Sequence, residues 1–214
     1  INKSILQGKG VVTGNLFIGQ TGMESLAPFP YDVQKAKEYL ARTSYGPGKQ
    51  PLNLQIQATV QRSWPEMLSI VAVIADGWKK IGIDSTITYR DYASYRAQWN
   101  AEKLPAPSVA FNIFSGRADW SSQAASMLRC GTKSLPQVCE PQLDALLNTW
   151  VSSKDEASYV QAGRAVERSV YENLYHVPIV AAAPLYAGND QVPASYSPGN
   201  IARGIFIRGL VTSK

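Results

Sequence analysis

The stretch "NIFSGRADWSS", residues 112–122, gathers side chains that could recognise a small molecule. A predicted strand ends at Phe114, and Arg117, Asp119 and Trp120 follow before a helix begins. In α/β sheets, ligands bind just beyond the carboxyl ends of the strands. There Asp119 would offer a carboxylate to an amine, Arg117 would pair with a carboxylate, and Trp120 would form an apolar wall. A structural explanation is equally open, because an acid in this place could simply cap the helix.

The sequence lacks the signatures of the common enzyme classes. His176 is the single histidine, and no acid or nucleophile lies at a spacing from it that would indicate a catalytic pair. Its place beside a predicted buried strand favours a structural role. Neither a phosphate loop nor the Gly-x-Ser-x-Gly pattern of many hydrolases occurs. We therefore expect no catalytic residue, no metal site and no cofactor. The alternative of a hydrolase or transferase would depend on His176.

Two cysteines, Cys130 and Cys139, flank a segment that contains Gly131 and Pro136. These two residues allow the segment to fold back as a loop, and a disulfide across it is typical of an oxidising compartment. Two separate free thiols are the alternative. Zinc is not indicated, because the sequence has neither a Cys-x-x-Cys pair nor a second ligand cluster.

The composition indicates a folded protein with a sizeable core. The chain has 214 residues, of which 45% are hydrophobic, and no apolar run approaches the length of a membrane span. The net charge of +5 comes from 21 basic and 16 acidic residues, and the basic residues are scattered. A nucleic-acid footprint would be clustered. A basic interaction module remains an alternative, and the charge also suits a protein that works beside anionic lipid headgroups.

Strands alternate with helices through the first half of the chain, which predicts an α/β fold with a mostly parallel sheet flanked by helices. Hydrophobic periodicity predicts strands at 52–58, 83–89, 108–114 and 176–183, and helices at 33–42, 63–81, 92–101, 122–128, 141–150 and 155–173. Residues 1–8 resemble the tail of a further helix that stops at Gly8.

The first complete predicted helix has a well-marked start. Asp32 follows a Pro-Phe-Pro stretch and can accept a hydrogen bond from the first turn. Val33, Ala36, Tyr39 and Leu40 fall on one face of this helix, and the charged residues fall on the other, which indicates an amphipathic surface helix.

Several segments, in order, resemble the C-terminal lobe of the family 5 extracellular solute-binding proteins, the dipeptide-, oligopeptide- and nickel-binding components of ABC transporters. The segments are "INKSILQGKGVVTG", "PFPYDVQKAKEYLARTSYG", "VIADGWKKIGIDSTITYRDYASY", "GRADWSS", "CEPQLDALLNTW" and "YENLYHVPIV". Each motif is loose alone, but their common order is more specific, and together they cover nearly the whole chain.

The resemblance implies a periplasmic-binding-protein-like (type II) lobe, and a partner lobe that is absent from this chain. Residues 1–183 would form the C-terminal lobe, and residues 184–214 would cross back to the missing N-terminal lobe. The implied partners are a peptide-like or other amine-bearing solute and an ABC permease in the inner membrane. The implied location is periplasmic, or extracellular and membrane-associated.

The resemblance also implies roles for single residues. In peptide-binding relatives, an acid in the loop that matches "GRADWSS" pairs with the ligand's α-amino group, and Asp119 is the best positional match. Phe114, Arg117 and Trp120 would surround it. The usual loop is closer to Asp-x-x-Asp/Glu-Pro, and this one lacks the proline and the second acid, so a strict peptide specificity is not implied. Some relatives also carry a cysteine pair in this region.

Overall fold

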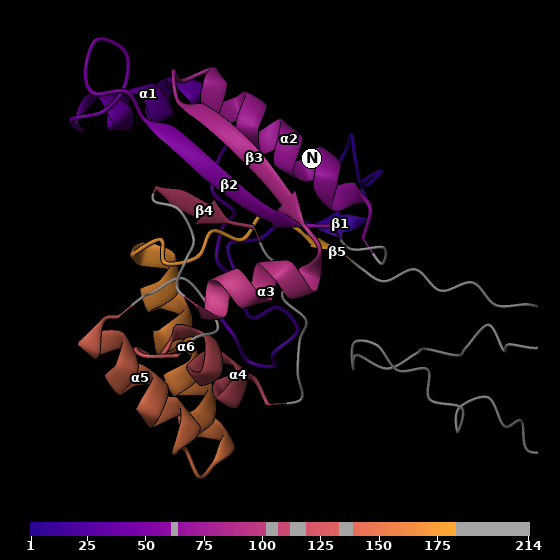
Figure 1. Cartoon of the computed structure of the whole chain (residues 1–214). Coiled ribbons are helices and arrows are strands. Elements are labelled where there is room, and N and C mark those ends of the chain that lie inside the picture. Colours follow the sequence, from indigo (N-terminus) through magenta and orange to yellow (C-terminus); the bar gives the residue numbers. More distant parts are fainter. Residues whose placement is uncertain (61–63, 102–106, 112–118, 133–138, 183–214) are drawn as a thin grey trace, which may run out of the picture.

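The structure is a computed structural model that describes residues 1–60, 64–101, 107–111, 119–132 and 139–182 (Figure 1). Its helices are α1 (Val33–Ala41), α2 (Glu66–Lys79), α3 (Tyr92–Asn100), α4 (Trp120–Leu128), α5 (Pro141–Val151) and α6 (Glu156–Glu172). Its strands are β1 (Gly10–Val11), β2 (Asn53–Thr59), β3 (Asp84–Arg90), β4 (Ser108–Ala110) and β5 (Ala181–Ala182). Within these residues, no helix is both long and apolar enough to cross a membrane.

The larger sheet has the order β3-β2-β4, and both strand pairs are parallel. One face carries Ile56 and Ala58, which pack against Met67 and Val71 of α2. The opposite face carries Ala110, which packs against α3. Because α2 and α3 cover opposite faces, the sheet is enclosed as parallel sheets require. The predicted α/β fold with a parallel sheet is confirmed.

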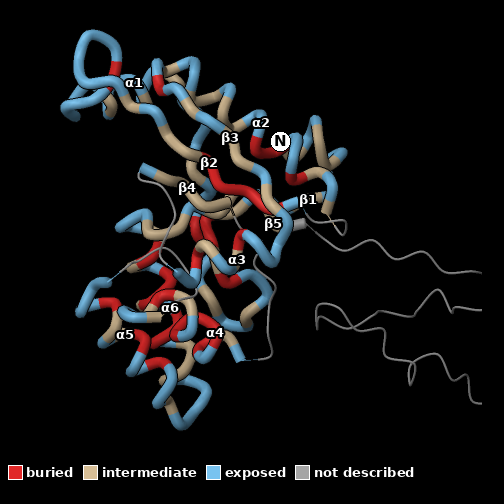
Figure 2. The backbone as a smooth tube through the Cα atoms, viewed as in Figure 1, coloured by how far each residue is buried: buried red, intermediate tan, exposed pale blue. Residues whose placement is uncertain are grey.

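A second layer of the molecule consists of the helices α4, α5 and α6 (Figure 1). Their buried side chains form the largest core cluster, shown in red in Figure 2, with Trp150 fully enclosed at its centre. Gly163 lets α6 approach this indole closely, since a Cβ there would lie 2.8 Å from the Trp150 ring. Phe17 joins the same core from a distant part of the sequence and meets the Trp150 ring edge-on at 5.4 Å between centroids.

The segment 13–29 runs along α6 and is tied to it at several points. The carboxylate of Glu167 accepts hydrogen bonds from the backbone N–H groups of Leu16 and Phe17. The Tyr171 hydroxyl donates to the carbonyl of Ala27 at 3.0 Å. These bonds hold a segment without regular secondary structure against a helix about 150 positions later in the chain.

The short strands β1 and β5 pair antiparallel, so residues near the start of the chain meet residues 181–182. The predicted strand at 176–183 is therefore shorter than expected within the described residues. Residues 1–8 form hydrogen-bonded turns rather than a helix tail, although Gly8 has the positive φ of +78° expected of a stop residue. The assignment of residues 1–183 to one lobe and of 184–214 to a crossover stays a prediction, and the second segment lies outside the described residues.

Asp32 caps α1 as predicted, accepting the Lys35 N–H at 2.8 Å. Tyr39 lies on the apolar face of this helix and is nevertheless 56% exposed. The cause is local: the ring lies between the cationic groups of Lys35 and Arg42, at 5.9 and 5.4 Å from its centroid. These contacts keep the aromatic ring on the surface.

Candidate functional site

The carboxyl ends of the three parallel strands form one edge of the sheet, at Thr59, Arg90 and Ala110 (Figure 1). This edge is where α/β sheets bind ligands. Chain segments that leave it lead to α2, α3 and α4. At this edge Arg90 supplies a guanidinium, Asp91 a carboxylate and Tyr89 an aromatic ring.

Arg90 is the cation fixed at this edge. Its Nη1 donates to Oε1 of Gln57 at 2.7 Å, and Gln57 is only 1% exposed. The two residues lie on the face of the sheet that α3 covers, on neighbouring strands. A buried amide thus holds the guanidinium in place and leaves other N–H donors of Arg90 for a carboxylate.

An apolar ledge lies on the other face of the same edge and consists of Val60, Trp64, Leu68 and Tyr89. Val60 is 50% exposed, and Leu68 and Tyr89 are close to 40%. The Tyr89 hydroxyl donates to the Leu68 carbonyl at 3.3 Å, which fixes the ring against α2. Trp64 packs on the core beneath α2. Exposed apolar groups beside fixed polar groups are typical of small-molecule sites.

Asp119 lies at the N-terminus of α4 and caps it. Its Oδ1 accepts from the N–H groups of Ser121 and Ser122, at 3.0 and 3.3 Å, and from the Ser121 hydroxyl at 2.8 Å. The Tyr159 hydroxyl lies 3.4 Å from the same oxygen. Hydrogen bonding from Ser122 and Ser121 holds the pKa of Asp119 below its usual value, although partial burial opposes it.

The helix cap uses only one oxygen of Asp119. The bonds from the backbone of α4 both reach Oδ1, and Asp119 is exposed. The ionised carboxylate can therefore cap α4 and still accept a hydrogen bond from a ligand amine. The two hypotheses that the sequence left open, that Asp119 binds a ligand and that it caps the helix, are therefore compatible.

Trp120 is half-buried and faces the helical core, where its ring meets Phe17 edge-on at 5.7 Å. This contact gives the indole a structural role, and its use as a ligand wall stays a prediction. Phe114 and Arg117 lie outside the described residues, so their predicted roles also stay predictions. Of the four predicted ligand residues, the structure describes Asp119 and Trp120.

The structure joins Cys130 to Cys139 by a disulfide, with their Cα atoms 4.3 Å apart. This is the pairing favoured from the sequence. The bond fastens the segment after α4 to the start of α5, where Asp144 also accepts the Cys130 N–H at 3.0 Å.

Burial lowers the pKa of His176 to about 4, so the imidazole is neutral near pH 7. No cluster of three or more potential metal ligands occurs among the described residues.

Sequence reasoning did not single out Arg90, Gln57 or the apolar ledge. The signal was present, since Arg90 directly follows the strand predicted at 83–89, and the same rule on strand ends applies to it. The pairing of Arg90 with Gln57 joins residues 33 positions apart and depends on strand register.

Residues 1–130 match the family described as bacterial extracellular solute-binding proteins, family 5 Middle. The chain belongs to this family. This family 5 protein is similar to heme-binding protein A of Haemophilus influenzae, with 24% identity over 166 residues that make up 76% of this chain and 30% of that protein.

Solved structures share the fold of this family 5 lobe. A dipeptide binding protein from Pseudoalteromonas sp. SM9913, in complex with Met-Leu, matches 85% of this chain and 36% of its own, with 19% identity and a TM-score of 0.67. NikA from Staphylococcus aureus, in complex with Ni(L-His)2, matches 84% of this chain and 38% of its own, with 17% identity and a TM-score of 0.69. The expected periplasmic-binding-protein-like (type II) fold is confirmed, and the chain spans about a third of the length of these relatives.

Proposed function

We propose that this chain is the C-terminal ligand-binding lobe of an ABC importer's substrate-binding protein. The match of residues 1–130 to the solute-binding family carries the proposal. The lobe supports it, because its parallel sheet presents fixed polar groups and exposed rings at the carboxyl edge. An N-terminal lobe of the same protein would close over this edge, and an ABC permease in the inner membrane would receive the solute.

The proposed ligand is a peptide-like or other amine-bearing solute. The exposed carboxylate of Asp119 suits an amine, and Arg90, held by Gln57, suits a carboxylate. Arg117 and Phe114 are further proposed contacts from the segment just before Asp119. The structural relatives were solved with Met-Leu and with Ni(L-His)2, both of which carry amino acid groups.

The proposed mechanism is binding without chemical turnover. The groups at the carboxyl edge can neutralise and orient a zwitterion, and the described residues provide no activated nucleophile there. The proposed location is periplasmic, or extracellular and membrane-associated. The Cys130–Cys139 disulfide supports an oxidising compartment.

Native mass spectrometry of the two-lobed protein, purified from the periplasm, tests this function. We expect a non-covalent small-molecule adduct that is released on denaturation and leaves chemically unchanged. Calorimetry with the released compound should then give saturable one-to-one binding. A protein that carries no adduct and binds neither dipeptides nor amino acid chelates would contradict the proposal, as would an adduct that is converted to a product.

A further inference from the structure

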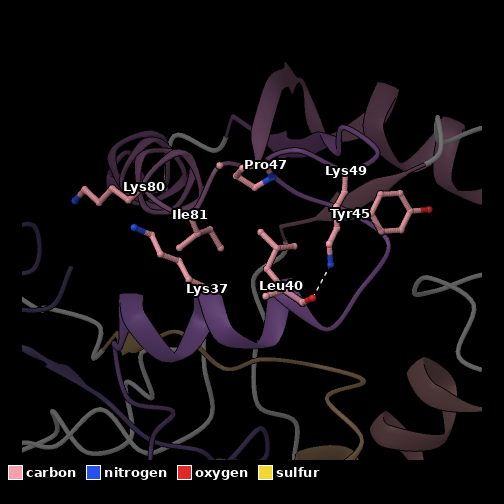
Figure 3. Close-up of a pocket in the computed structure, with 9 residues that line it drawn as sticks. Lys37, Leu40, Tyr45, Pro47, Lys49, Lys80 and Ile81 are labelled. Atoms are coloured by element: carbon pink, nitrogen blue, oxygen red, sulfur yellow. Dashed lines mark hydrogen bonds between the residues drawn. The ribbon is translucent and has the colours of Figure 1, made fainter.

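A second concave surface lies at the opposite edge of the sheet, where β2 and β3 begin. It is a pocket of about 420 Å³ between the end of α1, the loop before β2 and the turn after α2 (Figure 3). Its lining residues are Lys37, Leu40, Ala41, Tyr45, Pro47, Lys49, Lys80, Ile81 and Gly82. Since this pocket and the candidate ligand site lie at opposite ends of the strands, they can be occupied independently. We call it the amino-edge pocket.

The wall of the amino-edge pocket is held by a network of close contacts. Lys49 folds back over the end of α1, and its Nζ donates to the carbonyls of Ala41 and Thr43 at 2.6 and 2.8 Å. Gly82 has a φ of +81°, and a Cβ there would lie 2.5 Å from Pro47. The loop therefore rests directly on the turn after α2, which gives the pocket a defined shape before any partner binds.

The chemistry of the pocket is an apolar centre with cations beside it. Figure 3 shows Leu40, Pro47 and Ile81 in the middle, with Lys37 and Lys80 together on one side. Lys80 pairs with Asp76 at 3.2 Å on an exposed surface. Among the described residues, Lys37 has no carboxylate partner.

The surroundings of the pocket are basic and rich in tyrosine. Segments 31–49 and 76–82 carry six basic and three acidic residues, a surplus of three out of the chain's net +5. Tyr31, Tyr39 and Tyr45 are exposed, at 77%, 56% and 37%. Tyrosine and arginine are enriched among the residues that dominate protein–protein binding, and Arg42 lies among these tyrosines.

We propose that the amino-edge pocket binds an acidic segment of a partner protein, which inserts one apolar side chain between its own carboxylates. The apolar centre would take the side chain, and Lys37 and Lys80 would meet the carboxylates. A concave pocket favours an inserted side chain over a flat membrane surface. The proposal does not depend on the identity of the solute or on the carboxyl edge of the sheet.

Titration of the isotope-labelled chain with synthetic acidic peptides, followed by NMR, tests the proposal. The probes are capped Asp-Glu-X-Glu-Asp peptides in which X is Leu, Ile, Phe, Met or Gly. We expect saturable shifts at the amides of Leu40, Ile81 and Gly82 with at least one apolar X. The Gly peptide should bind about tenfold more weakly, because it buries no side chain.

Paired variants identify the contribution of the lysines. The double variant Lys37→Gln, Lys80→Gln should bind the peptides about tenfold more weakly than the wild type. Added salt should reduce this difference in affinity between the two proteins. Lys3→Gln with Lys154→Gln removes the same charge from exposed positions elsewhere and should change little. An equal loss of peptide affinity in both double variants would overturn the proposal. The absence of NMR shifts at millimolar peptide concentration would overturn it as well. Binding of anionic phospholipid vesicles, lost in the first pair while no peptide binds, would assign the surface to a membrane instead.

Discussion

The carboxylate of Glu167 accepts the backbone N–H of Phe17 at 3.1 Å, across 150 positions of sequence. Glu167 is 3% exposed and Phe17 is 1% exposed. The same Oε1 also accepts the N–H of Leu16. The buried carboxylate of Glu167 on α6 thus accepts hydrogen bonds from two backbone N–H groups that lie outside any helix or strand. These bonds hold Phe17 in its position in the helical core.

Two substitutions of Glu167 should distinguish the contribution of its hydrogen-bond acceptor from the contribution of its negative charge. Glu167→Ala leaves the buried N–H of Phe17 and the partly buried N–H of Leu16 unpaired, and it should lower the free energy of unfolding by about 2–4 kcal/mol. Glu167→Gln keeps an oxygen acceptor of the same shape and should cost clearly less. Urea unfolding of both variants checks this order. Equal losses would show that the charge, not the acceptor, holds the segment.

The pH dependence of stability should differ between the wild type and Glu167→Gln. Burial raises the pKa of Glu167 above its ordinary value of 4.5, against hydrogen bonds from Phe17 and Leu16 that lower it. The folded state therefore keeps the proton to higher pH than the unfolded chain does. The resulting stabilisation is complete below the unfolded pKa and is lost as pH rises through the folded pKa.

Because glutamine does not titrate, the unfolding free energy of the wild type minus that of Glu167→Gln should fall as pH increases from about 4.5. Urea unfolding of both proteins in matched buffers between pH 4 and pH 7 measures the difference. A difference that rises with pH would mean that the hydrogen bonds outweigh burial in the folded state.

Two helical glycines should respond oppositely to alanine. A Cβ at Gly163 would lie 2.4 Å from Met23 Cε and 2.8 Å from the buried Trp150 ring, whereas a Cβ at Gly77 meets nothing within 4 Å. Gly163→Ala should therefore destabilise by about 1–3 kcal/mol through overpacking. Gly77→Ala should stabilise by about 0.5–1 kcal/mol, because alanine is the better helix former. Thermal unfolding of both variants tests the contrast, and a stabilised Gly163→Ala would mean that α5 and α6 pack more loosely than described.

The disulfide should contribute about 3 kcal/mol, the value expected for closing a short loop in the chain-entropy model. The double variant Cys130→Ser, Cys139→Ser should have a free energy of unfolding lower by this amount, measured in urea. Reductant should no longer change its stability. Wild type treated with reductant should lose a similar amount. Two alkylatable thiols in unreduced protein, purified from an oxidising compartment, would disprove the bond.

The sequence predicted the elements that local signals determine. Asp32 marks the start of α1, and alternation between Leu52 and Ala58 predicted β2 within one residue at each end. Phe17 could not be assigned to the core in this way, because the segment around it has no periodicity and is held by contacts with α6. The same reason applies to the pairing of β1 with β5, which depends on residues about 170 positions apart.

The candidate site was predictable in part. The rule that ligands bind at strand ends led to Asp119, and its cap geometry follows from the residue type. Arg90 could not be selected without the register of β2 and β3, because that register places Gln57 on the same face of the neighbouring strand, within reach of its side chain. Tyr39 lies on the apolar face of its helix and is exposed, with the cationic groups of Lys35 and Arg42 close to its ring.

Asparagine at position 119 should distinguish ligand recognition from helix capping. Asn caps helices about as well as Asp, so Asp119→Asn should keep the free energy of unfolding within about 0.5 kcal/mol of the wild type. Asp119→Ala removes the cap and should cost about 1 kcal/mol. If Oδ2 meets a ligand amine, both variants lose the charge and should weaken solute binding by about 2–4 kcal/mol. Calorimetry with the co-purified solute, on the two-lobed protein, measures the affinity.

Asp32 provides the matched control, because it caps α1 through Lys35 N–H in the same way and lies far from the carboxyl edge. Asp32→Asn and Asp32→Ala should reproduce the stability changes without any change in affinity. An unchanged affinity in Asp119→Asn would reduce Asp119 to a helix cap. Recognition at the carboxyl edge would then depend on Arg90 and on the residues that precede Asp119, since the charge at Oδ2 would make no contact with the solute.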